Sequence, residues 1–212
     1  MDPARRVEVA TRLRALGHEF VARDLSDEAL AAMGESVDEL LAVVRAAPVR
    51  QRRVPRASVE AFALAVPEEG RLVKHQLFAD SVVSGLANPM GLGAHLWRDG
   101  SAAVMEVTLG AAFEGAPGRS HGGVVAALVD ETMGLVMGIQ GVLAFTARLE
   151  LTFRAPTPIG VPIVARAWLA GRDGRKLTIL ATVVADDEVV AEAEALFIEV
   201  DPSTFLEAAV EG

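Results

Sequence analysis

The chain has 212 residues, of which 51% are hydrophobic, and its 20 Lys and Arg against 29 Asp and Glu give a net charge of −9. An acidic chain is a poor partner for nucleic acid, because that binding depends on neutralising phosphates. The lack of cysteine excludes a disulfide framework, a thiolate nucleophile and a cysteine-based metal site. No uninterrupted apolar run approaches the ~18 residues that span a bilayer. We therefore expect a cytoplasmic protein with no membrane segment.

Residues 1–47 are predicted to be helical, with apolar residues at near-helical spacing at Val7, Leu13, Leu16 and Phe20. Gly17 is a possible interruption. A capping-box pattern over residues 36–39 predicts a helix start, and Pro48 predicts its end. Residues 1–70 are thus expected to form a helical extension and linker, an accessory layer against the core or a partner chain.

From residue 74 the apolar pattern becomes typical of short strands. Asp99-Gly100 and Asp173-Gly174 predict hairpin turns, and residues 186–188 give a weaker turn signal. Within 146–153, polar and apolar residues alternate cleanly, as in a half-buried strand. The expected strands lie near residues 74–83, 93–98, 101–109, 142–154, 161–171, 175–186 and 188–200.

One helix, near residues 121–138, separates these strands and is apolar almost all round, so we expect it to be buried on most sides. One buried helix with an antiparallel sheet curled around it is an α+β fold. Residues 71–212 are predicted to form this domain.

The start and the middle of this helix carry groups with a chemical use. His121-Gly122-Gly123 forms a Gly-rich turn, and backbone N–H groups at a helix start can bind an oxyanion. Asp130 and Glu131 lie mid-helix, where a carboxylate among apolar residues is costly unless it is paired or employed. Together these groups indicate acyl transfer. Adjacent helical residues lie about 100° apart, so only one carboxylate should face the site.

Three segments resemble the hotdog-fold acyl-CoA thioesterases, and the PaaI-like and THEM4-like group in particular. They are residues 114–123 with Asp130 nine residues after His121, residues 144–158, and Asn88-Pro89-Met90-Gly91. The resemblance covers roughly residues 75–200. It implies a hotdog fold and hydrolysis of an acyl-CoA thioester, with no cofactor other than the coenzyme A of the substrate.

The resemblance assigns roles to six residues. Asp130 would attack the thioester or activate water, with Glu131 at the rim, paired with an Arg, or in a swapped role. The Gly123 N–H, helped by Gly122, would polarise the carbonyl. His121 would either orient the thioester and its oxyanion loop or simply cap the helix. Thr146 would position the hydrolytic water, unless it is an ordinary strand residue.

Substrate contacts are weaker predictions. Asn88 is placed at the pocket mouth, although an Asn-Pro turn needs no further reason. Basic side chains are candidates for the CoA phosphates, although such residues are usually just solvated; they are Arg148, Arg154, Arg172, Arg175 and Lys176. The histidines other than His121 show no ligand spacing, so no metal site is expected.

Nine residues at 1.5 Å each place Asp130 roughly 13 Å from His121 along the helix axis. One helix cannot bring its own glycines and its own carboxylate onto one carbonyl, whereas a second, antiparallel copy could. We therefore predict an obligate homodimer with two equivalent sites, alone or as a dimer of dimers. Two other functions remain open. One is a hotdog hydratase or dehydratase on acyl thioesters, and the other is a non-catalytic acyl-CoA binding module.

Overall fold

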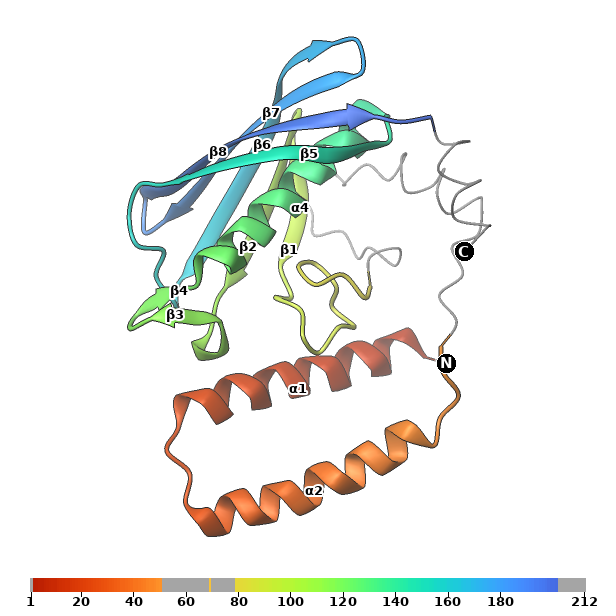
Figure 1. Cartoon of the computed structure of the whole chain (residues 1–212), viewed down its shortest axis with the longest axis vertical. Helices are drawn as coiled ribbons and strands as arrows, with labels where there is room; N and C mark the ends of the chain where they lie inside the picture. Colours follow the sequence, from red (N-terminus) through yellow and green to blue (C-terminus); the bar gives the residue numbers. More distant parts are fainter. Residues whose placement is uncertain (1, 51–68, 70–78, 202–212) are drawn as a thin grey trace.

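The computed structural model describes residues 2–50, 69 and 79–201 (Figure 1). A six-stranded sheet curves around helix α4 (Gly122–Gln140), and helices α1 (Pro3–Ala22) and α2 (Asp27–Arg45) lie to one side of this body. The expected antiparallel sheet around one central helix, with helices at the N-terminus, is confirmed. The predicted boundary between residues 70 and 71 lies outside the described residues.

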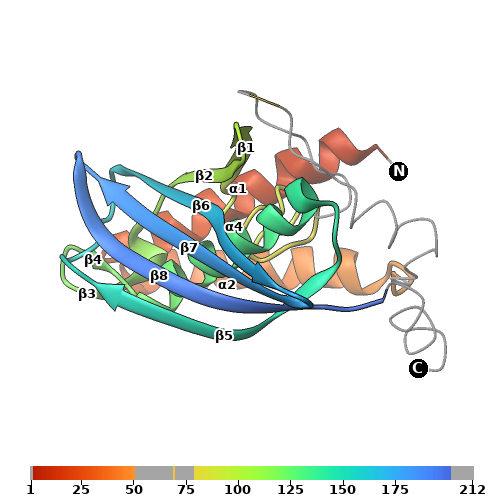
Figure 2. The same ribbon diagram turned by 90° about the horizontal axis from the view of Figure 1, so that it is seen from above.

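The strands of the sheet follow the order β1-β2-β6-β7-β8-β5, and every neighbouring pair is antiparallel. Figure 2 shows the strands sweeping along one side of α4. A 3₁₀ turn, η1 (Ala111–Phe113), and a small separate pair, β3 (Glu114–Ala116) and β4 (Arg119–Ser120), precede α4. The bounds of the six strands are β1 (His95–Asp99), β2 (Ala102–Thr108), β5 (Ala144–Phe153), β6 (Pro162–Asp173), β7 (Lys176–Ala185) and β8 (Glu188–Glu199).

The three predicted turns all join neighbouring strands of the sheet. Gly100 and Gly174 have positive φ angles of 59° and 56°, and so do Asp186 and Asp187, at 48° and 63°. Positive φ is what tight hairpin turns need, and Asp is one of the few residues besides Gly that adopts it readily. The strand expected near 74–83 is wrong where it can be seen, because residues 79–83 belong to a loop that runs to residue 94. Residues 74–78 lie outside the described part.

Helix α4 is the most buried helix of the described chain. Nine of its 19 residues are buried, and they pack against the concave face of the sheet. Of the others only Gly123 is exposed, and the rest are half-buried. By length and hydropathy it is the one helix in the described chain that could cross a membrane, but half of it is buried inside the domain, as in the core helix of a globular fold. The expected burial is therefore confirmed on the sheet side, and the remaining residues of the helix are covered in part.

The N-terminal helices differ from the prediction in their boundaries. The break falls between Ala22 and Asp27 and not at Gly17, and α2 begins at Ser26, whose side chain accepts a hydrogen bond from the Ala29 N–H. The predicted cap at Ser36 is wrong, since its hydroxyl donates to the Ala32 carbonyl inside α2. No residue of α2 is buried. Helix α1 contacts the body through Ala10 and the polar residues near it, while its apolar residues are exposed, among them Leu13, Leu16 and Phe20.

Candidate active site

The two residues with the most specific predicted roles are joined by a hydrogen bond. The Thr146 hydroxyl, at the start of β5, donates to Oδ1 of Asp130 in the middle of α4, at 2.8 Å. Asp130 is half-buried and Thr146 is exposed, so the pair is accessible to a ligand. A hydroxyl donating to a carboxylate fixes the direction of its second, free oxygen, as a base or nucleophile requires.

A β-bulge turns Thr146 toward Asp130. Thr146 pairs with the buried Phe197 of β8, whereas Arg148 pairs with the neighbouring residue Leu196, so Ala147 is an extra residue on β5. Directly paired residues point to the same face of a sheet, which places Thr146 on the α4 side and Arg148 on the outer side. The clean alternation expected over 146–153 therefore holds only from residue 148 onward.

The N-terminus of α4 is capped by a histidine side chain. His121 is the N-cap of α4, and its Nδ1 accepts a hydrogen bond from the Gly123 N–H at 3.0 Å. The predicted capping role is thus confirmed, and the N–H proposed to polarise a carbonyl is occupied in this structure. The Gly122 N–H has no hydrogen bond to any described residue. It can donate a hydrogen bond to a ligand oxygen without displacing a protein group.

Close packing explains the glycines around this turn. A Cβ on Gly122 would lie 3.1 Å from Cζ of Phe153, and one on Gly115 would lie 2.7 Å from Cα of His121. Both distances are shorter than ordinary contacts between carbon atoms. The glycines therefore let β3 and β5 approach the first turn of α4.

The second carboxylate faces a different element. Glu131 accepts hydrogen bonds from the Ser81 hydroxyl at 2.5 Å and from the Ser84 N–H at 3.1 Å. Asp130 faces β5 and Glu131 faces the loop of residues 79–94, as the rotation between adjacent helical positions requires. Glu131 therefore holds a loop in place, and it pairs with no arginine in the described part of the chain.

Asn88 lies in the same loop and organises it. Its side-chain amide donates to the carbonyls of Asp80 and Ser81, each at 3.2 Å, and its Oδ1 accepts from the Met90 N–H at 2.9 Å. All three contacts are local, which is typical of an Asx turn. The turn interpretation of Asn88 accounts for its side chain. Its predicted contact with the substrate stays a prediction.

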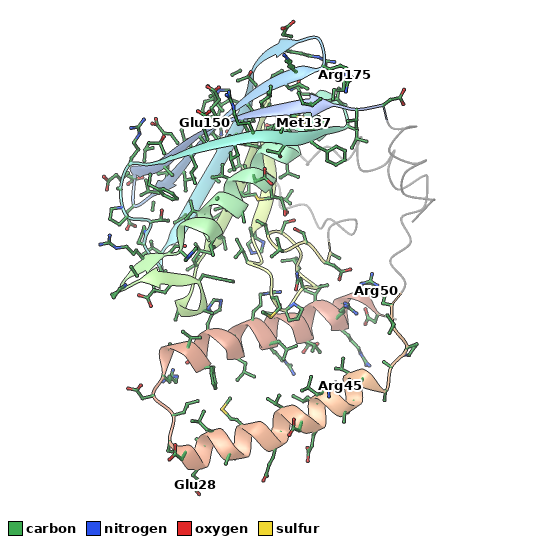
Figure 3. The ribbon with its side chains drawn as sticks, in the orientation of Figure 1. Glu28, Arg45, Arg50, Met137, Glu150 and Arg175 are labelled. Carbon is green, nitrogen blue, oxygen red and sulfur yellow. The ribbon has the colours of Figure 1, made fainter. Side chains whose placement is uncertain are left out.

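The arginines predicted for CoA phosphates point away from Asp130. Arg148 and Arg154 are on the outer face and pair with Glu194 and Glu192, at 3.7 Å and 2.6 Å. Arg175 lies at the far hairpin, where its Nε donates to the Glu199 carbonyl at 2.9 Å (Figure 3).

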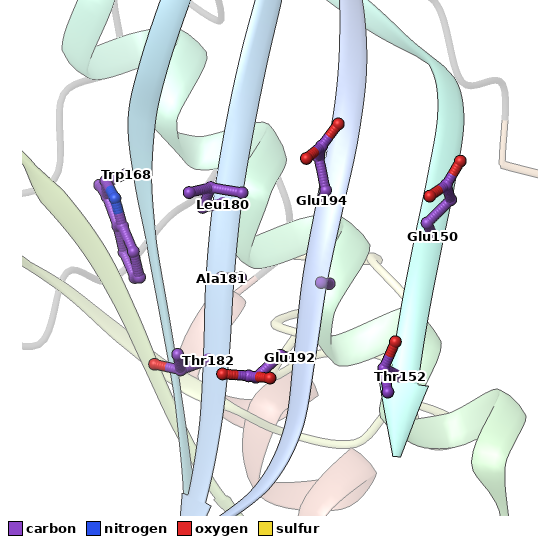
Figure 4. A pocket seen from close by; sticks show the side chains of 9 residues that line it. Glu150, Thr152, Trp168, Leu180, Ala181, Thr182, Glu192 and Glu194 are labelled. Atoms are coloured by element: carbon purple, nitrogen blue, oxygen red, sulfur yellow. The ribbon is translucent and has the colours of Figure 1, made fainter. Parts of the chain in front are cut away.

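Figure 4 shows a pocket on the outer face of the sheet. An open depression of about 310 Å³ there is lined by residues that include Glu150, Glu192, Glu194 and Trp168. The single chain thus does not bring these arginines to the Asp130 site, and phosphate binding by them stays a prediction. No group of three His, Asp or Glu in the described residues could hold a metal ion.

Four residues that the sequence analysis did not single out also bear on the site. Ser81 and Ser84 contact Glu131, and Arg14 and His18 of α1 contact the loops beside α4. Serines in a loop and polar residues on a helix carry no sequence signal for such contacts, because each depends on where distant backbone lies.

Comparison with known proteins shows what this chain is similar to. Residues 117–192 match the Thioesterase superfamily. Acyl-coenzyme A thioesterase THEM4 of Mus musculus is 39% identical over 92 residues, 42% of this chain and 40% of that protein. THEM4 of Bos taurus is 32% identical over 137 residues, 64% of this chain and 56% of that protein. The chain spans about half the length of the curated relatives it matches.

The solved structure of RHA08564, a thioesterase superfamily protein, is similar with a TM-score of 0.75 and 23% identity, covering 91% of this chain and 90% of that chain. At this identity the likeness shows the fold. The body of this chain therefore has the hotdog fold, and in sequence it is similar to the thioesterase superfamily over residues 117–192 and to THEM4 over part of its length.

Proposed function

We propose that this protein hydrolyses an acyl-CoA thioester to the free acid and CoA. The observation that carries the proposal is the Thr146–Asp130 hydrogen bond, because it presents an oriented carboxylate on an accessible side of the core helix. The THEM4 relatives are acyl-coenzyme A thioesterases by name, which supports this substrate class.

Two routes use the same carboxylate. In the first, Asp130 takes a proton from water, and the hydroxide adds to the thioester carbonyl carbon while the C=O electron pair moves to oxygen. Collapse of this intermediate breaks the C–S bond, and the CoA thiolate takes the proton from Asp130. In the second, Asp130 itself adds to the carbonyl carbon and expels CoA thiolate, and water then hydrolyses the mixed anhydride. Thr146 orients Asp130 in both.

The start of α4 supplies the stabilisation of negative charge. The Gly122 N–H is open to a ligand, and the Gly123 N–H becomes so when a carbonyl oxygen replaces Nδ1 of His121. Both N–H groups lie at the positive end of the helix dipole. Loss of one such donor typically slows acyl transfer about 10²–10³-fold.

A second copy of the chain would bring these two parts together. Gly123 and Asp130 are seven residues apart on one helix, roughly 10 Å along its axis. Helix α4 contacts edge strand β5, where Phe145 and Phe153 are 44% and 50% exposed. Exposed apolar side chains at a sheet edge are typical of a surface that a partner covers. We propose a homodimer in which Asp130 of one chain faces Gly123 of the other.

The hydratase alternative would need a histidine to work with the carboxylate. His121 caps the helix roughly 13 Å from Asp130 along the axis. Its ring is bonded to Gly123, on the same helix as Asp130. Within one chain His121 therefore does not form an acid–base pair with Asp130.

The test is release of free thiol from acyl-CoAs, from short aliphatic to long-chain and phenylacetyl, by wild type, Asp130→Asn and Asp173→Asn. Asp173 ends β6 at the far hairpin and makes the matched control. We expect turnover by wild type and by Asp173→Asn, and its collapse in Asp130→Asn. Turnover by none of the three, with binding of the acyl-CoA retained, would instead establish a non-catalytic binding module.

A further inference from the structure

Helix α1 docks on the domain through a stripe of three residues spaced four apart, Ala10, Arg14 and His18. Ala10 is only 3% exposed, and both polar residues are half-buried. A helix that presents polar residues to the body it packs on forms specific hydrogen bonds there, because buried polar groups need partners. The contacts of Arg14 and His18 therefore show which segments of the domain α1 binds.

Arg14 holds the loop of residues 79–94. Its Nη1 donates to the carbonyls of Leu86 and Asn88, at 3.0 Å and 2.7 Å. In Figure 1 this loop lies between α1 and the body of the domain. Hydrogen bonds from a guanidinium are charge-assisted and stronger than neutral ones. The hydrogen bonds of Arg14 thus attach the loop to α1 on its outer side.

The inner side of the same loop is fastened to α4. Glu131, the residue after Asp130, accepts hydrogen bonds from Ser81 and Ser84. Between them lies Val82, whose side chain is 58% exposed. The loop is also tightly wound, since a Cβ on Gly85 would lie 2.3 Å from the backbone N and O of Ser81. A displacement at Leu86 would therefore be transmitted to Ser81 and Ser84.

His18 makes the second contact of α1, on the segment that leads into the catalytic helix. Its Nδ1 accepts a hydrogen bond from the Ala112 N–H at 3.1 Å, and its ring meets Phe113 edge-on at 5.1 Å between centroids. The Phe113 carbonyl in turn accepts the His121 N–H at 2.8 Å. Both contacts of α1 thus end on residues that adjoin the proposed catalytic groups.

We propose that α1 is a clamp that sets acyl-chain specificity, with Arg14 and Glu131 as positioning residues that hold the 79–94 loop between α1 and α4. Val82, exposed between the two serines that bind Glu131, presents the apolar surface of that loop and contacts the acyl chain. This inference rests on the proposed thioesterase function.

The test compares Arg14→Met and Arg14→Lys with Arg12→Met. Arg12 is on the same helix and pairs only with Glu8 on its exposed side, so its substitution makes the same change of charge without touching the loop. The readout is the ratio of kcat/KM for a long-chain and a short-chain acyl-CoA. A loss of folded protein lowers both values equally and leaves this ratio unchanged.

We expect Arg14→Met to change the ratio about five-fold, in line with the loss of part of two charge-assisted hydrogen bonds. Arg14→Lys should change it less and Arg12→Met not at all. Val82→Ala, which leaves the hydrogen bonds of Arg14 and Glu131 to the loop in place, should also shift the ratio. Equal loss on both substrates in Arg14→Met, or an unchanged ratio in Val82→Ala, would overturn the clamp.

Amide hydrogen exchange separates the clamp from the enzymatic reaction. Exchange in residues 79–94 should be faster in Arg14→Met than in wild type and unchanged in Arg12→Met, with no substrate present. If wild type turns over no thioester, the proposed function fails whatever the exchange shows. If wild type is active and the loop exchanges at the same rate in all three proteins, only the clamp fails.

Discussion

Thr146 contacts Asp130 because β5 contains a β-bulge, in which Ala147 is the extra residue. The bulge places Thr146 on the α4 side, where its hydroxyl donates to Oδ1 of Asp130, and sends the next paired residue, Arg148, to the opposite face. A regular strand would leave Thr146 and Arg148 on the same face. The contact between the two proposed catalytic residues thus depends on an irregularity, as is common for bulges beside active sites.

The hydrogen bond itself can be tested by removing the donor. Thr146→Val keeps the shape of the side chain but leaves Asp130 without its partner. We expect kcat to fall about ten-fold, the lower end of what a hydrogen bond to a charged group is worth. Thr146→Ser should retain most of the activity. Thr152→Val, on the outer face of the same strand, is the control. Full activity in Thr146→Val would show that Thr146 is an ordinary strand residue with no role in the reaction.

His121 offers a test that separates capping from chemistry. Since its Nδ1 accepts the Gly123 N–H, His121→Ala should destabilise the protein by about 1 kcal/mol, as the loss of an N-cap does. Asn is a good N-cap, so His121→Asn should keep both stability and most of the turnover. Urea unfolding and thiol release on the same samples measure the two effects. A stable but inactive His121→Asn would show that the ring takes part in the reaction.

The sequence predicted best what local chemistry determines. The hairpin turns at Gly100 and Gly174 and the start of α4 at Gly122 follow from residues that lie within a few positions. The face of the sheet on which Thr146 lies could not be predicted. The polar and apolar residues alternate through Ala147 as in a regular strand, so the sequence contains no sign of the bulge. The side of α1 that packs on the domain could not be predicted from the sequence either. Its apolar residues are exposed, and Arg14 docks on carbonyls more than 70 positions away.

The attachment of α1 should weaken in acid. Burial lowers the pKa of His18, and the nearby charge of Arg14 lowers it further. Its Nδ1 must be unprotonated to accept the Ala112 N–H. As the pH falls below about 6.5, the unfolded chain takes up a proton on this residue before the folded chain does. The contribution of His18 is therefore complete above that pH and is lost as the pH falls through the lower, folded pKa.

Urea unfolding at pH 7 and pH 5 measures this loss. The decrease in the free energy of unfolding between the two values should be smaller in His18→Gln, whose amide oxygen can still accept a hydrogen bond but does not titrate. Equal decreases in wild type and His18→Gln would remove His18 as the cause.

The shared site predicts that two inactive chains restore each other. Asp130→Asn lacks the carboxylate, and Gly123→Pro lacks the amide donor while placing proline in the first helical turn, where it is tolerated. If Asp130 of one chain works with Gly123 of its partner, a mixed dimer of these variants contains one site with both groups intact. Random mixing makes half of the dimers mixed, each with one working site out of two, so about a quarter of wild-type activity should return.

The recovery must appear only after subunit exchange, for example after the two proteins are unfolded together and refolded. Each variant treated alone should stay inactive and should have the same mass as the wild-type assembly in solution. Recovery near a quarter would place Asp130 and Gly123 of different chains in one site. No recovery, from mixed dimers whose formation is verified by differently tagged chains, would mean that each chain uses its own helix start. The free Gly122 N–H would then have to act without a partner chain.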